Sequence, residues 1–242
     1  MSLILAADTS TAINSVALCR EDAILAEAVI DGRRLHSERL LPTVQWLLDE
    51  SGVALAQVDL LAISIGPGSF TGLRIGAATW KGLAFANDLP LIGVPTLDAM
   101  THLLPGRARS YVATVLDARM KEVFFAVYRL DGGAREKVAP DQVGSIAHFM
   151  DTLEALPGFD PATVSLLGDG VHAFQEALWA RWPDAALASP AQSAPRASAV
   201  ALEGLALHRA GAPSSADAVN PMYLRKSQAE VNRDKRLAAA AN

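Results

Sequence analysis

The chain has one cysteine, no long apolar run and few charged residues, and each shortage excludes a class of protein. Cys19 stands alone among 242 residues, so an intramolecular disulfide and a cysteine-based zinc site are excluded. No apolar run approaches the ~20 residues of a membrane span. The N-terminus runs directly into a strand-like segment, without the basic and long apolar stretches of a signal peptide. These features predict a cytoplasmic protein.

Charge is scarce and unevenly distributed. Charged residues make up 19% of the chain, below the ~25% of an ordinary soluble domain, which favours some coverage of apolar surface by another subunit. The net charge is −5; residues 221–242 carry five cations and two anions, a net +3, so the remainder carries −8. A protein that binds nucleic acid alone normally has a basic face. Any role with RNA is therefore expected to depend on a partner.

The residue patterns of common catalytic sites are also missing. The five histidines stand at positions 36, 102, 148, 172 and 208, at least 24 residues apart, so no helical pair of zinc ligands exists. There is no Gly-x-Ser-x-Gly elbow, and Cys19 lies in a predicted strand, a poor place for a nucleophile. The sequence predicts no metal site and no hydrolytic centre.

The hydrophobic pattern predicts two copies of one unit, strand-strand-strand-helix-strand-helix. In each copy the first strand ends in an aspartate, Asp8 or Asp117. A single doubly wound α/β domain is the alternative, but it alternates strands and helices one for one. We therefore predict an α/β fold of the duplicated actin-like (ASKHA) type. The expected division is an N-terminal lobe over 1–106, a C-terminal lobe over 107–226 and a polar tail over 227–242.

The turn after the first strand reads Asp8-Thr9-Ser10-Thr11. Actin-fold kinases have a glycine at this turn, which lets backbone amides approach the nucleotide phosphates. Here Ser10 adds a Cβ that crowds that space. Two readings remain open: an aspartate that caps its own turn, or a weak or vestigial nucleotide site that includes Asp8 and Ser10.

The Gly66–Gly76 segment is the most distinctive part of the sequence, a glycine-rich loop between a buried strand and a helix. It lacks the Gly-Lys-Ser/Thr of a Walker loop, so a packing role is favoured over phosphate binding. The helix predicted over Leu73–Asn87 is apolar almost all round, which is typical of burial on two sides. The second cover is either the Leu40–Leu48 helix or another subunit. The residues that we assign to a partner interface are Arg39, Trp46, Gly72, Gly76, Trp80 and Leu83.

The second predicted lobe repeats the strand-end aspartate in Asp117-Ala118-Arg119. Asp117 and Arg119 form either a salt-bridged strand end or part of a site that faces the cleft between the lobes.

These segments together resemble the TsaB (YeaZ) family over roughly residues 1–226. The resemblance rests on five stretches: Leu3–Thr11, His36–Glu38, Gly66–Gly76, Asp117–Arg119 and Pro221–Arg225. It implies an actin-like fold with no catalysis of its own and no cofactor.

The resemblance also implies partners. Members of the family pair with their paralogue TsaD, which holds the metal and transfers a threonylcarbamoyl group to N6 of the adenosine beside the tRNA anticodon. The ATPase TsaE completes the set, and tRNA is reached only through the complex. Pairing through the first-lobe helices, with TsaD or with a second copy of the chain, is implied as well. The alternatives are an actin-fold ATPase or phosphotransferase and a peptidase that acts on TsaD.

Overall fold

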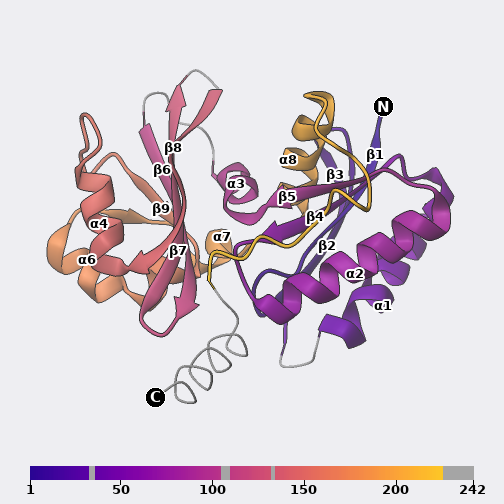
Figure 1. Ribbon diagram of the computed structural model, residues 1–242, viewed down its shortest axis with the longest axis horizontal. Helices are drawn as coiled ribbons and strands as arrows, with labels where there is room; N and C mark the ends of the chain where they lie inside the picture. The colour runs from indigo at the N-terminus through magenta and orange to yellow at the C-terminus, as the bar shows by residue number, and fades with distance from the viewer. Residues whose placement is uncertain (33–35, 105–109, 132–133, 226–242) are drawn as a thin grey trace, which may run out of the picture.

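The computed structural model describes residues 1–32, 36–104, 110–131 and 134–225, and the predicted tail over 227–242 lies outside these residues. Two five-stranded sheets stand side by side (Figure 1). The first has the strand order β3-β2-β1-β4-β5, and the second has the order β8-β7-β6-β9-β10. The strands are β1 Leu3–Asp8, β2 Ile13–Arg20, β3 Ala23–Asp31, β4 Leu60–Gly66, β5 Leu91–Pro95, β6 Ser110–Arg119, β7 Glu122–Asp131, β8 Ala134–Ser145, β9 Ser165–Leu167 and β10 Ala186–Leu187.

The two sheets repeat one topology. In the first sheet β1 pairs antiparallel with β2 and parallel with β4. In the second sheet β6 pairs antiparallel with β7 and parallel with β9. The predicted duplication and the actin-like fold class are therefore confirmed.

Helices cover both faces of the first sheet. Leu5 and Ala7 of β1 face the core beneath α1 and α2, whereas Ile4 faces α8. A strand buried on both faces is apolar at every position, which is why this segment lacks alternation. The helices are α1 His36–Glu50, α2 Phe70–Asn87, α3 Thr96–Met100, α4 Ile146–Glu154, α5 Asp169–Ala173, α6 Gln175–Arg181, α7 Pro190–Ser193 and α8 Ala197–Arg209, with 3-10 turns η1 Leu55–Gln57 and η2 Thr101–Leu103. None of the helices in the described residues is long and apolar enough to cross a membrane.

Helix α8 corrects the predicted domain division. The sequence assigned all of 107–226 to the C-terminal lobe, but α8 packs on β1, β2 and β4 of the first lobe. Small residues allow this close approach: a Cβ on Gly204 would lie 2.9 Å from the Cβ of Ala62. Because an alanine-rich helix has a weak hydrophobic pattern, the sequence did not reveal this packing.

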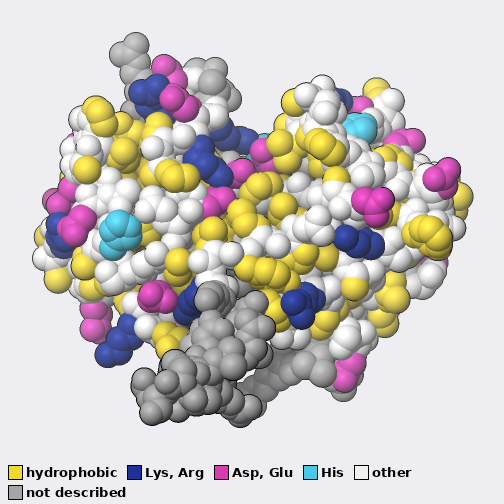
Figure 2. All heavy atoms as spheres, viewed as in Figure 1, with side chains coloured by type: hydrophobic (Ala, Val, Ile, Leu, Met, Phe, Trp, Pro, Cys, Tyr) yellow, Lys and Arg dark blue, Asp and Glu magenta, His cyan; other side chains and the backbone are white. Residues whose placement is uncertain are grey.

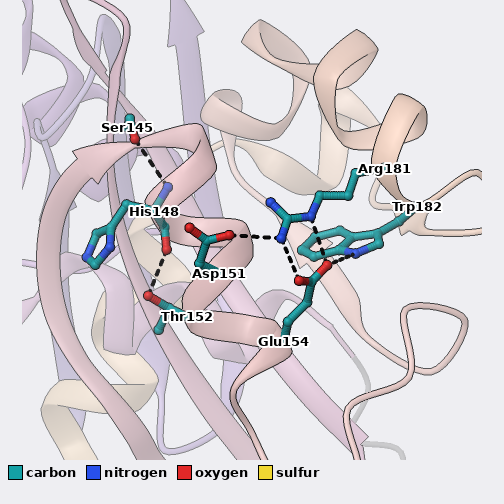
Figure 3. A network of polar contacts seen from close by, with 7 residues as sticks. All are labelled: Ser145, His148, Asp151, Thr152, Glu154, Arg181 and Trp182. Atoms are coloured by element: carbon teal, nitrogen blue, oxygen red, sulfur yellow. Dashed lines mark hydrogen bonds and ion pairs between the residues drawn. The ribbon is translucent and has the colours of Figure 1, made fainter.

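In the second lobe, a network of hydrogen bonds and ion pairs links α4 to the end of α6 (Figure 3). The Arg181 guanidinium donates to Asp151 Oδ1 at 2.8 Å and to Glu154 Oε1 at 2.8 Å, and Trp182 Nε1 donates to the same Glu154 oxygen at 3.0 Å. The hydrogen bond from Arg181 holds the pKa of Glu154 below its usual value. These side chains satisfy one another, so the network serves the lobe's own packing.

Three glycines of the Gly66–Gly76 segment lack the Cβ atoms that would collide with the β1–β2 turn of the same lobe. A Cβ would lie 2.3 Å from the Ser10 carbonyl oxygen at Gly68, 2.1 Å from the Thr9 carbonyl oxygen at Gly72, and 2.3 Å from Thr9 Oγ1 at Gly76. Real Cβ atoms essentially never come so close to other atoms, so these three positions require glycine. The packing role of the loop therefore concerns contacts within the chain.

This geometry corrects part of the predicted partner interface. Gly72 and Gly76 face Thr9, and Trp80 is fully buried in the first-lobe core, so none of the three is on a free surface. The assignment of Gly76 to a partner interface is wrong, because Thr9 of the β1–β2 turn occupies the space beside it. Gly82 differs, since no atom outside its chain neighbours and its own helix backbone lies within 4 Å of its Cβ position.

A matched pair of substitutions distinguishes these glycines. Gly76→Ala is expected to lower the free energy of unfolding by about 1–3 kcal/mol, because the added methyl group overpacks the turn. Gly82→Ala is expected to raise it by up to ~1 kcal/mol, because alanine favours an exposed helix interior. Urea unfolding of both variants measures these two changes in the free energy of unfolding. Equal midpoints for the two variants would contradict the close contact at Thr9.

Candidate functional site

A cleft of about 610 Å³ lies between the two lobes. Most of its lining comes from the β1–β2 turn, the loop that leads into α2, the β6–β7 turn and the chain around Met222–Arg225, and His36 of α1 and Asp169 of α5 complete it. It holds most of the predicted cleft residues, namely Ser10, Asp117 and Arg119, whereas Asp8 lies beneath the surface.

Asp8 caps its own turn. Its Oδ1 accepts hydrogen bonds from the backbone N–H of Ser10 at 2.9 Å and from Ser10 Oγ at 2.8 Å. Its side chain is buried, and its Oδ2 has no hydrogen-bond partner among the described residues. Burial raises the pKa of Asp8 above its usual value. Of the two readings of this turn, the geometry matches the capping aspartate.

The Gly66–Gly76 loop forms hydrogen bonds with the backbone and a side chain of the same turn. The N–H of Ser69 donates to the Ser10 carbonyl oxygen at 2.6 Å, and Thr9 Oγ1 donates to the Gly72 carbonyl oxygen at 2.9 Å. The N–H of Ser10 itself donates to Asp8, so this amide is not free for a phosphate.

Across the cleft, Asp117 and Arg119 combine both predicted readings. Asp117 Oδ2 pairs with Arg119 Nη1 at 3.1 Å, and Oδ1 accepts from the Arg119 N–H at 2.8 Å. The pair therefore forms a salt-bridged strand end that also lines the cleft. Burial, with the adjacent Asp117 adding to it, raises the pKa of Asp169.

The charges that line the cleft largely neutralise one another. Arg225 pairs with Glu122 at 3.1 Å, as Arg119 pairs with Asp117. Asp169 adds a further carboxyl group. An anionic ligand would therefore meet arginines whose positive charge is already offset by a neighbouring carboxylate.

An apolar face remains exposed on α1 and α2, which pack against each other on the first lobe (Figure 1). Phe85 of α2 is 91% exposed and Trp46 of α1 is 55% exposed. Ala78 and Gly82 precede Phe85 by seven and three residues and are also exposed, so the three share one side of the helix. Figure 2 shows apolar side chains spread over the part of the first lobe where Figure 1 places α2.

The predicted interface residues that are not buried within the chain differ in how they contribute to this face. Trp46 belongs to it, and Arg39 and Leu83 are half-buried beside it. Phe85 was recognised in the sequence only as one of the apolar residues of its helix. Ala78, Gly82 and Phe85 stand at positions i, i+4 and i+7, which lie on one side of a helix. This spacing is the sequence signal from which the exposed side of α2 could have been found.

Asp8→Asn tests the buried carboxyl group. Because the pKa of Asp8 is raised in the folded protein, folding favours the protonated form, and this contribution to stability is lost as pH rises through the folded pKa. The asparagine variant lacks this loss and keeps an acceptor for Ser10. Its free energy of unfolding relative to the wild type should therefore increase from below about pH 3.9, the usual pKa of aspartate, towards neutral pH.

The exposed residue Asp22 supplies the control for this experiment, as Asp22→Asn. Chemical denaturation at several pH values gives the comparison. A wild-type protein that gains stability over Asp8→Asn as pH rises would show that the charged form of Asp8 is the stabilised one.

Comparison with known proteins identifies the family. A family model described as TsaD, tRNA N6-adenosine threonylcarbamoyltransferase, matches residues 23–233. The structure of YeaZ from Pseudomonas aeruginosa superimposes with a TM-score of 0.73 at 33% identity, covering 93% of this chain and 100% of that chain.

Curated sequences agree with the structural match. The chain is 34% identical over 154 residues to TsaB of Bacillus subtilis, which covers 62% of this chain and 66% of that protein. It is 44% identical over 132 residues to TsaB of Escherichia coli, covering 53% of this chain and 55% of that protein. These alignments span less than two thirds of either relative, whereas the YeaZ superposition spans nearly the whole chain. On these matches, the chain belongs to the TsaB (YeaZ) family.

Proposed function

We propose that the chain is a non-catalytic accessory subunit of the bacterial complex that transfers a threonylcarbamoyl group to N6 of the adenosine beside the tRNA anticodon. In this proposal it acts in the cytoplasm by pairing with the catalytic subunit TsaD, with TsaE as the further protein of the complex. The observation that carries the proposal is the exposed apolar face of α1 and α2, with Phe85 and Trp46.

The shape of this face suits a helical partner. Ala78 and Gly82 leave a shallow stripe along α2, and small residues let helix axes approach to about 8 Å. Phe85 stands at one end of the stripe as a projecting aromatic ring, the kind of residue that dominates binding energy at interfaces. Large apolar side chains exposed on neighbouring helices are a feature of protein interaction sites. TsaD or, in its absence, a second copy of this chain is the proposed occupant.

The cleft gives little support to a nucleotide enzyme. The N–H of Ser10 donates to Asp8 and is not free for a phosphate, and the lining arginines are paired with carboxylates. We therefore propose that the chain alone has no ATPase or phosphotransferase activity. Tight binding of ATP to the isolated chain in calorimetry would favour the enzyme instead.

A peptidase is disfavoured on accessibility. A second Pseudomonas aeruginosa structure, 34% identical to this chain, is described as similar to a peptidase. Two serine hydroxyl groups contact an imidazole among the described residues. Ser193 Oγ lies 2.9 Å from His172 Nε2, and Ser214 Oγ lies 2.8 Å from His208 Nδ1 but donates to the Ala212 carbonyl oxygen. Ser193 is only 2% exposed, so a peptide cannot reach its hydroxyl group.

Contact with tRNA is proposed to occur only within the complex. The chain carries a net charge of −5, which repels phosphate at physiological salt. The five cations of residues 221–242 are proposed to assist once TsaD has bound the tRNA.

Substitutions on α1 and α2 test the pairing surface. Phe85→Asp and Gly82→Leu should each weaken the affinity for TsaD at least ~10-fold, because one removes an aromatic anchor and the other fills the stripe. Trp46→Ala should act in the same direction with a smaller effect. All three positions are exposed, so the fold should persist.

Trp179→Ala is the matched control, since Trp179 is 46% exposed on α6 of the other lobe. Calorimetric titration with purified TsaD measures affinity, and tRNA modification in a mixture with TsaD and TsaE measures function. If the folded α1 and α2 variants bind TsaD as tightly as Trp179→Ala does, the pairing surface lies elsewhere.

A further inference from the structure

The short helix α3 lies between the cores of the two lobes. Leu97 and Met100 are fully buried against β6 and β7 of the second lobe. Ala99, on the opposite side of the helix, packs into the core that α8 shares with the first sheet. A single turn of helix therefore has one lobe's core on each side, and any rotation between the lobes would expose Leu97 and Met100 to water.

Polar side chains surround this apolar contact and also cross between the lobes. Asp98 of α3 accepts a hydrogen bond from Tyr128 Oη of β7 at 2.5 Å and forms an ion pair with Lys137 of β8. Lys137 Nζ also lies 3.0 Å from Asp141 Oδ1. Burial lowers the pKa of Lys137, but its hydrogen bond and charge interactions with Asp98 and Asp141 outweigh this and raise it overall.

A second polar crossing runs through His102. Its Nε2 lies 2.7 Å from Glu203 Oε2 of α8, and Arg135 Nη1 of β8 lies 2.6 Å from Nε2 and 2.9 Å from Nδ1. The ring therefore contacts both α8 and the second lobe. The hydrogen bond with His102 lowers the pKa of Glu203 below its usual value.

The cleft is bridged at its other side as well. The N–H of Met222 donates to the carbonyl oxygen of Ile65 in the first lobe, and Arg225, three residues later, pairs with Glu122 of β7. Leu224 packs into the same core as Leu97 and Met100. The lobes are thus joined by α3 and also by the chain around Met222–Arg225.

We infer that the Thr96–Leu103 segment, comprising α3 and η2, is an interlobe lock that holds the cleft at one opening. Domain closure around a ligand requires a hinge that absorbs the rotation. Here the Thr96–Leu103 segment is packed and paired on both sides. The second lobe is consequently held at a fixed angle to the α1 and α2 face, and the chain presents itself to a partner as one rigid body. This inference does not depend on TsaD being the partner.

Distances between spin labels on the two lobes test the lock. Cys19 is buried, so labels can be placed through Asp22→Cys on the β2–β3 turn and Glu176→Cys on α6, both exposed positions. The labelled chain is diluted with an excess of unlabelled chain, so that only distances within one molecule contribute. The lock predicts a single narrow distance, unchanged by ATP with Mg²⁺.

The lock is then weakened by the double substitution Arg135→Gln and Lys137→Gln. The distance distribution should broaden roughly twofold, because lobe rotations on the microsecond-to-millisecond scale then become populated. Arg129→Gln is the matched control, since Arg129 pairs with Glu136 within the β7–β8 hairpin of one lobe. It should leave the distribution narrow.

Three results would overturn the inference. The first is two distances in the labelled chain that lacks the glutamine substitutions. The second is a shift of the distance on adding ATP with Mg²⁺, and the third is an unchanged distance distribution in the folded double variant. If the double variant fails to fold, Lys137→Gln alone is measured against the same control and judged in the same way.

Discussion

The packing of the glycine loop against the β1–β2 turn is the contact on which the rest of the first lobe depends. Gly72 and Gly76 bring α2 against Thr9, and Trp80, one turn further on, is buried in the core. With that side of α2 fixed, the stripe that contains Gly82 and ends at Phe85 faces outward. At the same turn, the N–H of Ser10 donates to Asp8 and is not free for a phosphate. The structure of this turn therefore disfavours a nucleotide site, and the packing of α2 against it leaves an apolar face exposed.

The order and type of most elements could be predicted from the sequence, because continuous apolar strands such as Leu3–Asp8 and strongly periodic helices such as α1 have clear local signatures. Helix α8 was not predicted, and its alanine-rich sequence resembles a weakly structured segment as much as a buried helix. Its return to the first lobe depends on contacts between residues far apart in the sequence, such as Gly204 with Ala62.

The direction in which each glycine faces could not be predicted either. The spacing of Gly72, Gly76 and Gly82 indicates that something approaches the helix closely, but not whether it is the chain's own turn or another molecule. Two of the three proved to face Thr9 and the third faces open space. The cleft residues Asp117 and Arg119 were correctly placed together, since they are two residues apart at a strand end, but their neutralisation of one another requires the geometry.

The proposed role combines the exposed helical face with a rigid connection between the lobes, and it requires TsaD to bind at α1 and α2. Backbone amide hydrogen exchange of this chain, alone and with purified TsaD, tests that requirement most directly because it reports on every segment at once. The account predicts slower exchange in α1 and α2, with the β6–β7 turn of the cleft unchanged. Protection confined to the cleft or to the second lobe, with α1 and α2 unaffected, would contradict it.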